Sequence, residues 1–472
     1  MKKKSGILVV IIFIAIAGSV YIGYRLYKPY KRIKIARERW GVETPCESIQ
    51  SPSFIRGKWS VVLIDKNIKY TDGAHNIIPY DLDKDGKIEL IADSYRSDTL
   101  ILYKYRAEPH LPDNWSRYVI DSAVGGHNPR GTGIQFIKSI VEEKLLGGFT
   151  SGAHYTAIAD INGDGRQDLF VAGDCKSNDI VWYESPENPT DISAWTKHVV
   201  YQNDSHRTYH IETGYVDADS HVDIVFTSKT DNSIGWLQNN ASPLNWTMTW
   251  IDKDCIRCFN AKVADIDKDG RNDVIASEDN SSNGGTLHLY RFSDDPGRTR
   301  NWMDFHLAQF QPGEGVSVFE IVDIDRDGDL DIVAANHQGS IYILRNPYAN
   351  SVLNKWDTYK ITARQPGNTN NFREIDVGDV DGDGDFDIVV ADEGQNQVVW
   401  FENEGQPFVE NWKKHNVDQS HEYLRWCHSV EFGDVDGDGD LDIAVAAAAS
   451  NVFLLYLNNL DRQGSPVMES GD

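Results

Sequence analysis

The chain has few cysteines, a shortage of basic residues and no linker-like stretch. Five cysteines in 472 residues are too few and too scattered for a disulfide framework. Lysine and arginine number 46 against 72 aspartate and glutamate, and the resulting net charge of −26 argues against DNA or RNA as a partner. Because no Pro- or Ser-rich segment divides the chain, we expect one large repetitive architecture rather than several domains.

The rest of the composition is that of an ordered β protein. Apolar residues make up 40% of the chain and charged residues 25%, and 13 tryptophans and 21 tyrosines suit β-structure. One pair of cysteines, Cys255 and Cys258, forms a C-x-x-C motif. With no second pair and no βαβ context, the motif predicts a local disulfide or two packed thiols rather than a zinc or redox site.

A single long apolar run lies near the N-terminus. Three lysines precede an uncharged stretch over residues 6–23, which is about as long as the shortest membrane-spanning helix. Residues 15–17 match the small-residue pattern of a signal-peptidase site, but they lie inside the run and further uncharged residues follow them. We therefore predict a retained transmembrane or signal-anchor segment over residues 1–23, with cleavage after Ala17 as the alternative.

The orientation of this segment is contested by two signals. The linker over residues 24–52 is basic, with more lysine and arginine than the three residues on the other side, so the positive-inside rule places the body in the cytoplasm. Loops that saturate with calcium suit the millimolar concentrations outside cells instead. We expect a single-pass membrane protein with an extracytoplasmic body, and the cytoplasmic placement stays open.

One phrase, D-x-D-x-D-G-x-x-D, recurs between residues 81 and 442. Carboxylates at positions one, three and five of a tight loop converge on one point, the glycine permits a sharp turn, and the acid at position nine closes the coordination shell. This oxygen chemistry predicts about six Ca²⁺ sites. Their ligands are Asp81, Asp83, Asp85 and Glu89; Asp160, Asn162, Asp164 and Asp168; Asp265, Asp267, Asp269 and Asp273; Asp323, Asp325, Asp327 and Asp331; Asp379, Asp381, Asp383 and Asp387; and Asp434, Asp436, Asp438 and Asp442.

A seventh, altered copy of the loop lies between the second and third complete ones. Tyr215 stands in place of the first ligand and Ser220 in place of the glycine, although Asp217, Asp219 and Asp223 are present. We expect this loop to make the same turn and to bind calcium weakly or not at all.

The segments after each loop repeat as well. An apolar run follows the loop, then an aromatic strand, and then a strand that begins at a tryptophan, so the unit is four strands with calcium between the first and the second. Seven copies at about 55 residues predict an all-β fold, a seven-bladed β-propeller over residues 53–460, followed by a tail over 461–472. The strand from Trp59 supplies the fourth strand of the last blade and closes the ring.

These loops and strands resemble the FG-GAP, or VCBS, repeat family over roughly residues 53–460. The resemblance implies a calcium-binding propeller similar to integrin α-subunit heads, lectin-like surface modules, propeller-type polysaccharide lyases and sugar dehydratases. It also implies that the calcium loops lie on one face and that ligands bind the other. It does not choose among these activities.

The strand register predicts which side chains line the other mouth of the channel. Residues six positions before each loop start lie about 20 Å from the loop, if the first strand runs straight into it. Five of them form one arc of groups, most of which can move protons or hold a transition metal. The arc is Arg373, His428, His75, His154 and Tyr209, and Phe259 and Ser317 complete the ring. Neighbouring loops add Arg207, His210, Arg257 and Arg425, and an insertion between the first two blades adds His127 and Arg130.

Two functions fit this mouth. The first is a surface module that binds a glycan or a protein, because arginine pairs with carboxylates and aromatic rings stack on sugars. The second is a polysaccharide lyase or sugar dehydratase acting on an acidic sugar. In that mechanism Arg373 neutralises the carboxylate, one of the three histidines takes the adjacent proton, and Tyr209 or another histidine protonates the leaving oxygen. A wet channel lined by ordinary polar side chains is the plainer interpretation.

Overall fold

The computed structural model describes most of the repeat region and leaves the N-terminal prediction outside it. Its described residues are 44–45, 55–56, 59–124, 153–173, 179–202, 208–217, 219–240, 245–279, 282–293, 296–347, 353–362, 370–419 and 423–460. The predicted anchor over 1–23 and the tail over 461–472 lie outside these residues. Across the described residues, no helix is both long and apolar enough to span a membrane.

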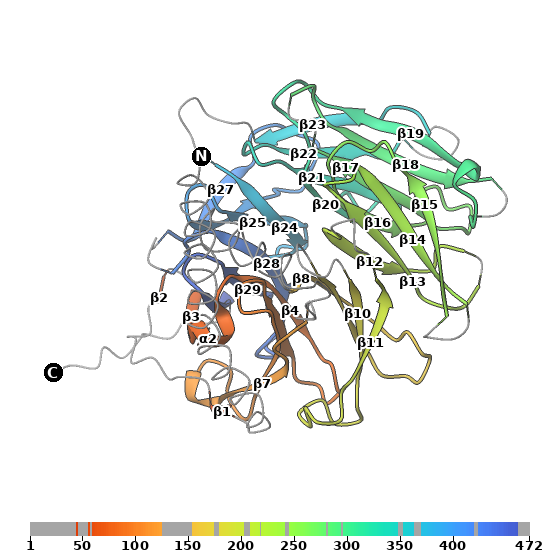
Figure 1. The fold of residues 1–472 in the computed structure, drawn as a ribbon. Coiled ribbons are helices and arrows are strands. Elements are labelled where there is room, and N and C mark those ends of the chain that lie inside the picture. The colour runs from red at the N-terminus through yellow and green to blue at the C-terminus, as the bar shows by residue number, and fades with distance from the viewer. Residues whose placement is uncertain are drawn as a thin grey trace, which may run out of the picture. The chain divides into compact units, whose positions relative to one another are not determined.

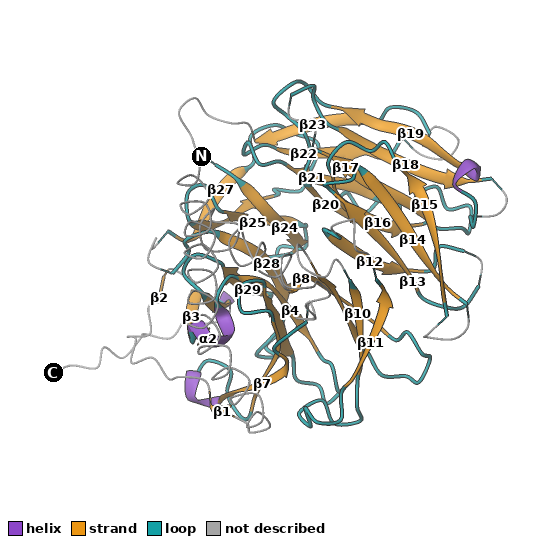
Figure 2. Ribbon diagram, in the orientation of Figure 1, coloured by secondary structure: helices purple, strands orange, loops and turns teal. Residues whose placement is uncertain are grey.

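The strands form seven antiparallel sheets, which we number as blades in chain order (Figures 1 and 2). Blades 1 and 2 are β4 (Ala74–Tyr80), β5 (Glu89–Ser94), β6 (Thr99–Tyr105) and β7 (Trp115–Asp121), then β8 (Ala153–Ala159), β9 (Asp168–Gly173), β10 (Ile180–Glu184) and β11 (Thr196–Tyr201). Blades 3 and 4 are β12 (His210–Gly214), β13 (Asp223–Ser228), β14 (Ser233–Asn239) and β15 (Trp246–Asp252), then β16 (Cys258–Ala264), β17 (Asp273–Glu278), β18 (Thr286–Phe292) and β19 (Trp302–Gln309).

The remaining blades follow the same order. Blades 5 and 6 are β20 (Val318–Val322), β21 (Asp331–Ala335), β22 (Ile341–Arg345) and β23 (Asp357–Thr362), then β24 (Phe372–Gly378), β25 (Asp387–Asp392), β26 (Gln397–Glu402) and β27 (Lys413–Asp418). Blade 7 is β28 (Cys427–Gly433), β29 (Asp442–Ala447), β30 (Val452–Leu457) and β3 (Trp59–Asp65). Short elements are β1 (Thr44–Pro45), β2 (Ile55–Arg56), α2 (Ile68–Thr71) and two 3₁₀ turns, Pro112–Asn114 and Thr299–Asn301.

The ring closes as the sequence predicts. β3 pairs with β30 through Val61–Tyr456 and Leu63–Leu454, so the strand from Trp59 is the fourth strand of blade 7. The first strands of successive blades lie side by side, in the order β4, β8, β12, β16, β20, β24 and β28, and β28 contacts β4. Because the N-terminal strand completes the last sheet, both ends of the repeat array are held in one blade, and the all-β, seven-bladed prediction is confirmed.

Apolar packing lies between the blades rather than within them. Seven hydrophobic clusters each join two neighbours. Phe170 and Trp182 of blade 2, for example, share a cluster with Ile211 and Phe226 of blade 3. Since one four-stranded sheet cannot cover its own faces, each blade depends on the next for its stability.

A buried hydrogen bond between tyrosine and aspartate repeats at several blade junctions. The Tyr103 hydroxyl of blade 1 donates to Asp65 of blade 7 at 3.0 Å, and Tyr183 donates to Asp121 at 2.8 Å. Tyr290–Asp252 and Tyr456–Asp418 repeat the contact at 2.8 and 3.0 Å. The hydroxyl of a core tyrosine is thereby satisfied by the fourth strand of the preceding blade.

The C-x-x-C motif is a disulfide. Cys255 and Cys258 are bonded at the turn that leads into β16, and both residues are buried. Of the two alternatives left open by the sequence, the local disulfide is confirmed. Cys427 is free and buried in the core between blades 6 and 7.

At two of these junctions a basic residue also pairs with the aspartate, and the different burial of the two ion pairs gives a first prediction. Arg117 pairs with Asp65 with only 4% and 0% of the side chains exposed, whereas the equivalent Lys197–Asp121 pair is 32% and 22% exposed. We expect Arg117→Met to lower the free energy of unfolding by about 3–5 kcal/mol, because it leaves a buried carboxylate without its cation. Lys197→Met should cost about 1 kcal/mol or less. Equal losses in chemical denaturation would contradict this reasoning.

Candidate functional site

The acidic loops fold around their first carboxylate. Asp81 accepts hydrogen bonds from the backbone N–H groups of Asp85 and Gly86, both at 3.0 Å. The glycine at position six has a positive φ in all six complete loops, from 84° to 98°, which is the conformation glycine adopts most easily. Positions one, three and five are thus brought together by the local backbone, as the spacing predicts.

The acid at position nine is buried and joins three parts of the structure. Asp442 accepts from the N–H of Val435 in its own loop at 2.8 Å and from the N–H of Asn458 after the third strand at 2.8 Å. The Asn458 side chain then donates to the carbonyl of Val380 in the loop of blade 6 at 2.8 Å. Position nine therefore ties its loop to the third strand and, through the asparagine, to the preceding blade.

Several loop carboxylates have oxygen atoms suited to a cation. Asp83 Oδ1, Asp323 Oδ1, Asp331 Oδ2 and Asp434 Oδ1 are buried without a hydrogen-bond partner. Within each of four loops, including those of blades 1 and 4, ligand oxygens also lie within 4.8 Å of one another. A buried carboxylate oxygen with no donor is costly unless a cation faces it, so these residues fit Ca²⁺.

A basic side chain of the third strand enters three of the loops. In blade 1 the Lys104 ammonium lies within 2.8 Å of the carboxylates at positions three, five and nine. Arg291 contacts Asp267 at 2.8 Å in blade 4, and Arg345 contacts Asp325 at 3.0 Å in blade 5. Calcium must compete with these cations, so we expect it to bind most tightly in blades 2, 6 and 7.

The altered loop of blade 3 departs at its sixth position from the turn that the sequence predicts. Tyr215 is 49% exposed, and Ser220 does not adopt the positive φ of the six glycines. Asp217 accepts instead from the Gln238 side chain at 2.6 Å. The Gln238 amide thus donates to a carboxylate that a bound calcium ion would otherwise contact. This agrees with a loop that binds calcium weakly or not at all.

Burial raises the pKa of most position-nine acids. Desolvation moves the pKa of Asp331 and Asp387 to about 7 and that of Asp442 to about 8, with nearby loop carboxylates adding to the rise. Without a metal, folding therefore requires these groups to stay protonated at a pH where the unfolded chain has released its protons.

This shift gives a pH-dependent prediction for calcium removal. Between the unfolded pKa near 4 and the folded pKa near 7 to 8, the metal-free folded state binds more protons, so its stability falls as the pH rises. Bound Ca²⁺ keeps the same carboxylates ionised and reverses the sign. In calorimetry, the loss of melting temperature on adding EDTA should be small near about pH 5 and large near about pH 8. A melting temperature that ignores EDTA at both values would contradict a structural role for calcium.

Two loops can be compared directly by single substitutions. Asp434→Asn changes the first ligand of blade 7, whose third strand ends in Leu457 rather than a basic residue, and should remove one bound Ca²⁺ per chain. Asp217→Asn in blade 3 is the matched control and should leave the calcium count unchanged. Equal calcium counts in both variants, measured by equilibrium dialysis, would mean that the loop of blade 7 is not a site.

A small cavity of about 30 Å³ lies at the opposite end of the first strands. Five residues of the predicted ring line it, and Tyr155, His210 and Glu374 are among the neighbours that complete the wall. The five are His75, Tyr209, Phe259, Arg373 and His428. The register of the first strands therefore brings together most of the side chains that the sequence places at this mouth.

Arg373 is the centre of this cluster. Its Nη1 donates to His337 Nε2 at 3.3 Å and its Nη2 to His428 Nε2 at 3.0 Å, while Glu393 pairs with its Nε at 3.2 Å. A guanidinium can only donate, so both imidazoles must present an unprotonated Nε2 and carry their proton on Nδ1. His75 lies against His428, with ring centroids 4.2 Å apart. Since His428 Nε2 faces a cation, the arrangement disfavours a transition metal on this arc.

Two aromatic residues also line the cavity, and a second cation lies against their rings. The Tyr209 and Phe259 rings meet edge to face at 4.5 Å, and Lys229 Nζ lies 3.9 Å from the centre of the Phe259 ring. His337 packs against Phe259 at 4.8 Å. Burial, together with the charges of Arg373 and Lys229, lowers the pKa of His337 to about 4 even though Asp279 opposes the shift, so His337 is neutral.

Other predicted mouth residues lie elsewhere or outside the description. Arg257 is turned to Asp279 at 3.2 Å and Arg425 is exposed, and neither lines the cavity. Ser317 is buried beside β20. Nothing is described for Arg207, His127, Arg130 or the side chain of His154.

The sequence reasoning missed Lys229, Asp279, His337 and Glu393. All four stand six positions after the position-nine acid, at the end of the second strand, just as the predicted ring stands six positions before the loop. The same register count on the second strands would have found them. The mouth is therefore built from two concentric sets of residues, one from each of the two inner strands.

A ring of acids lies deeper in the channel, three positions beyond the mouth residues. Glu212, Glu320, Asp376 and Glu431 surround Lys262, which pairs with Glu320 at 2.8 Å. Burial and mutual repulsion raise the pKa of Asp376 to about 7, and desolvation raises that of Glu212 to about 7. The cationic mouth thus stands above an acidic channel, which would repel an anion that entered further.

Comparison with known proteins matches part of the repeat region to a known sequence repeat. An FG-GAP-like repeat model matches residues 265–334, 323–390 and 379–445, each starting at a loop, and an FG-GAP repeat model matches residues 428–465. No curated protein matches the chain. Among solved structures, a lectin from Agrocybe aegerita, described as recognising non-reducing terminal N-acetylglucosamine, is 15% identical with a TM-score of 0.46. That comparison covers 75% of this chain and 83% of the other, and at this similarity it carries no argument about ligands. Residues 265–465 thus match FG-GAP repeats, and the seven sheets of the described residues form a seven-bladed β-propeller.

Proposed function

We propose that the protein is a calcium-stabilised binding module that takes an anionic glycan at the mouth of its channel. The observation that carries the proposal is the cavity lined by Arg373, histidines, Tyr209 and Phe259, with Lys229 lying against the two aromatic rings. A protein ligand with an exposed carboxylate would use the same contacts. Both belong to one class, a surface ligand with an acidic group.

The charge of the cavity favours an acidic group on the ligand. The contacts to His337 and His428 use two of the five N–H donors of the Arg373 guanidinium, and Tyr209 also bonds with it. Lys229 adds a second cation above the aromatic rings. On a molecule with a net charge of −26, this pair of cations is a local exception that would attract a carboxylate to the mouth.

The aromatic residues favour a sugar ring beside that carboxylate. The Tyr209 and Phe259 rings lie at 69° to each other, and Phe259 is only 3% exposed, so the partly exposed Tyr209 is the ring that can face a flat apolar surface such as a pyranose ring. The acidic ring below the mouth would hold the ligand across the opening and keep it out of the channel.

Binding is favoured over the lyase alternative because the Arg373 guanidinium is already held in place by partners within the protein. In the lyase mechanism this guanidinium would be the charge that stabilises a substrate enolate, but Glu393 pairs with it inside the protein. His428, a candidate base, directs its Nε2 at Arg373 rather than into open space. These contacts suit a preformed anchor for a ligand better than acid and base groups ready for proton transfer.

Calcium stabilisation, the N-terminal anchor and an extracytoplasmic body are parts of the same proposal. The orphaned loop oxygens support calcium, and the uncharged run over residues 6–23 supports an anchor. The Cys255–Cys258 disulfide supports an oxidising location outside the cytoplasm. The disulfide and the calcium loops therefore both favour an extracytoplasmic body, whereas the positive-inside rule favours a cytoplasmic one.

The test is binding by isothermal titration calorimetry, with the full chain in detergent and calcium present. Oligosaccharides of uronic acids should bind, and neutral oligosaccharides of the same length should bind more weakly. Arg373→Gln should weaken uronate binding by at least about tenfold, because a charge-assisted contact contributes roughly 1.5–3 kcal/mol.

Arg425→Gln is the matched control, since it removes the same charge from an exposed arginine outside the cavity. Equal affinity of the two variants for uronates would sink the mouth as the binding site. An unsaturated uronate product appearing in the ultraviolet with the wild-type chain would replace the binding module by the lyase. The melting temperature of each variant in calcium checks that the fold is retained.

A further inference from the structure

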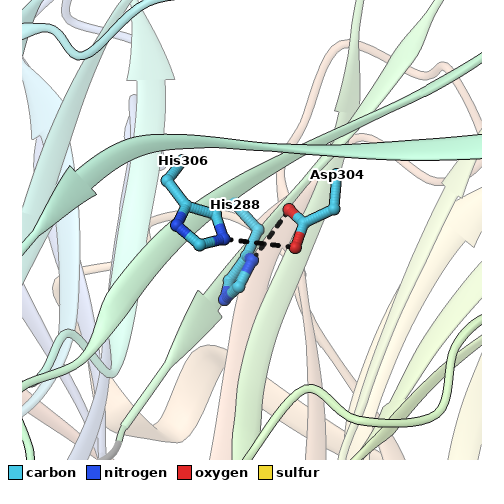
Figure 3. Close-up of side chains that lie close together, drawn as sticks. All are labelled: His288, Asp304 and His306. Atoms are coloured by element: carbon cyan, nitrogen blue, oxygen red, sulfur yellow. Dashed lines mark hydrogen bonds and ion pairs between the residues drawn. The ribbon is translucent and has the colours of Figure 1, made fainter.

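A cluster of two histidines and an aspartate lies on the outer strands of blade 4, away from the calcium loop and the channel mouth. His288 is on β18, and Asp304 and His306 are on β19, two residues apart on the same face of that strand. Figure 3 shows the Asp304 carboxylate facing both imidazole rings, with one oxygen directed toward each. His288 Nδ1 is 2.9 Å from Asp304 Oδ1, and His306 Nε2 is 3.3 Å from Asp304 Oδ2.

These distances match the spacing of ligands around a small metal ion. Zinc binds imidazole nitrogen and carboxylate oxygen at about 2.0–2.1 Å, so tetrahedral ligands stand roughly 3.3–3.5 Å apart. One ligand atom from each of the three residues lies within 4.8 Å of the other two. Small side-chain rotations would therefore bring all three to bonding distance of one ion.

A fourth residue stands where a supporting partner of a metal ligand belongs. His288 is only 8% exposed, and its Nε2 lies 3.6 Å from Glu278 Oε2, too far for a hydrogen bond in this arrangement. A histidine that binds metal through one nitrogen usually donates from the other to a carboxylate, which fixes the ring and its tautomer. In this arrangement His288 would bind the metal through Nδ1 and donate from Nε2 to the Glu278 carboxylate.

The repeat supplies an internal comparison that speaks against a scaffold role. At the register position of His288 the other six blades carry apolar residues, glycine or tyrosine, and at that of His306 they carry no second histidine. Asp304 stands where blades 1 and 2 have Arg117 and Lys197. Blade 4 has therefore exchanged a cation for an acid beside two histidines, which leaves room for a bound cation.

We propose that Asp304, His288 and His306 bind one divalent transition-metal ion, of the zinc class, on the outer strands of blade 4. The ligand set of two imidazoles and one carboxylate suits zinc rather than calcium. Exposure rises from 8% at His288 through 35% at Asp304 to 57% at His306, so the ion would enter from solvent and keep water in a fourth position. The site is independent of the proposed function of the channel mouth.

The test is titration of zinc chloride into the calcium-saturated full chain, so that the acidic loops are already filled. We expect one zinc ion per chain in isothermal titration calorimetry. Cobalt(II) at the same site should give the visible absorption of a low-coordinate nitrogen and oxygen site. His306→Gln should weaken zinc binding by at least about tenfold without unfolding the chain, because His306 is exposed, and Glu278→Gln should weaken it by about tenfold or more.

His198→Gln is the matched control, since His198 lies on the fourth strand of blade 2 with one carboxylate partner, Glu184, at 3.1 Å. It should bind zinc as the wild type does. Unchanged zinc affinity in His306→Gln, or loss of affinity equal to that in His198→Gln, would overturn the assignment. So would the absence of saturable zinc binding, which would mean that the cluster is an ion network held by a proton.

Discussion

The buried acid at position nine of each repeat is the constraint on which the architecture depends. In blades 3, 6 and 7 its two oxygens accept backbone N–H groups, one from the loop before it and one from the end of the third strand, as Asp387 does with Val380 and Asn403 at 3.0 and 2.8 Å. Both strands of the hairpin are thereby fixed relative to the loop. The same carboxylate faces the acidic side chains at positions one, three and five. The hairpin, the acidic loop and, through the asparagine after the third strand, the preceding blade are therefore joined at one group.

This arrangement explains why the loops and the mouth can be read from one count. The position-nine acid fixes where the second strand begins, and the first strand ends at the loop, so both inner strands start from a common origin. Six positions backward along the first strand and six forward along the second reach the same end of the channel. His428 and Arg373 come from the first count, and Glu393 and His337 from the second.

The fold could be predicted from the sequence because its signals are local and repeated. The loop spacing, the tryptophan at the fourth strand and the strand from Trp59 each follow from a few adjacent residues, and the pairing of β3 with β30 confirms the last of them. The cavity was predicted in outline, because register alone places His75 and Tyr209. Partner choice could not be predicted, because register brings several polar groups close to Arg373 and side-chain packing decides that Glu393 pairs with it. The cluster of His288 and Asp304 was missed because its members lie on the outer strands, where the repeat carries no motif.

Departures from a repeat are more informative here than the repeat itself. A position that is apolar in most blades is explained by packing between neighbours, and it needs no ligand. Where one blade replaces that residue by a titratable group, packing no longer explains it, because burying an imidazole such as His288 costs free energy unless its nitrogens are satisfied. The same reasoning applies at the mouth, where Arg373 is buried among histidines although blades 3 and 5 place Tyr209 and Ser317 at the equivalent position. A propeller scaffold would fold without either substitution, so each is best explained by something that the protein binds.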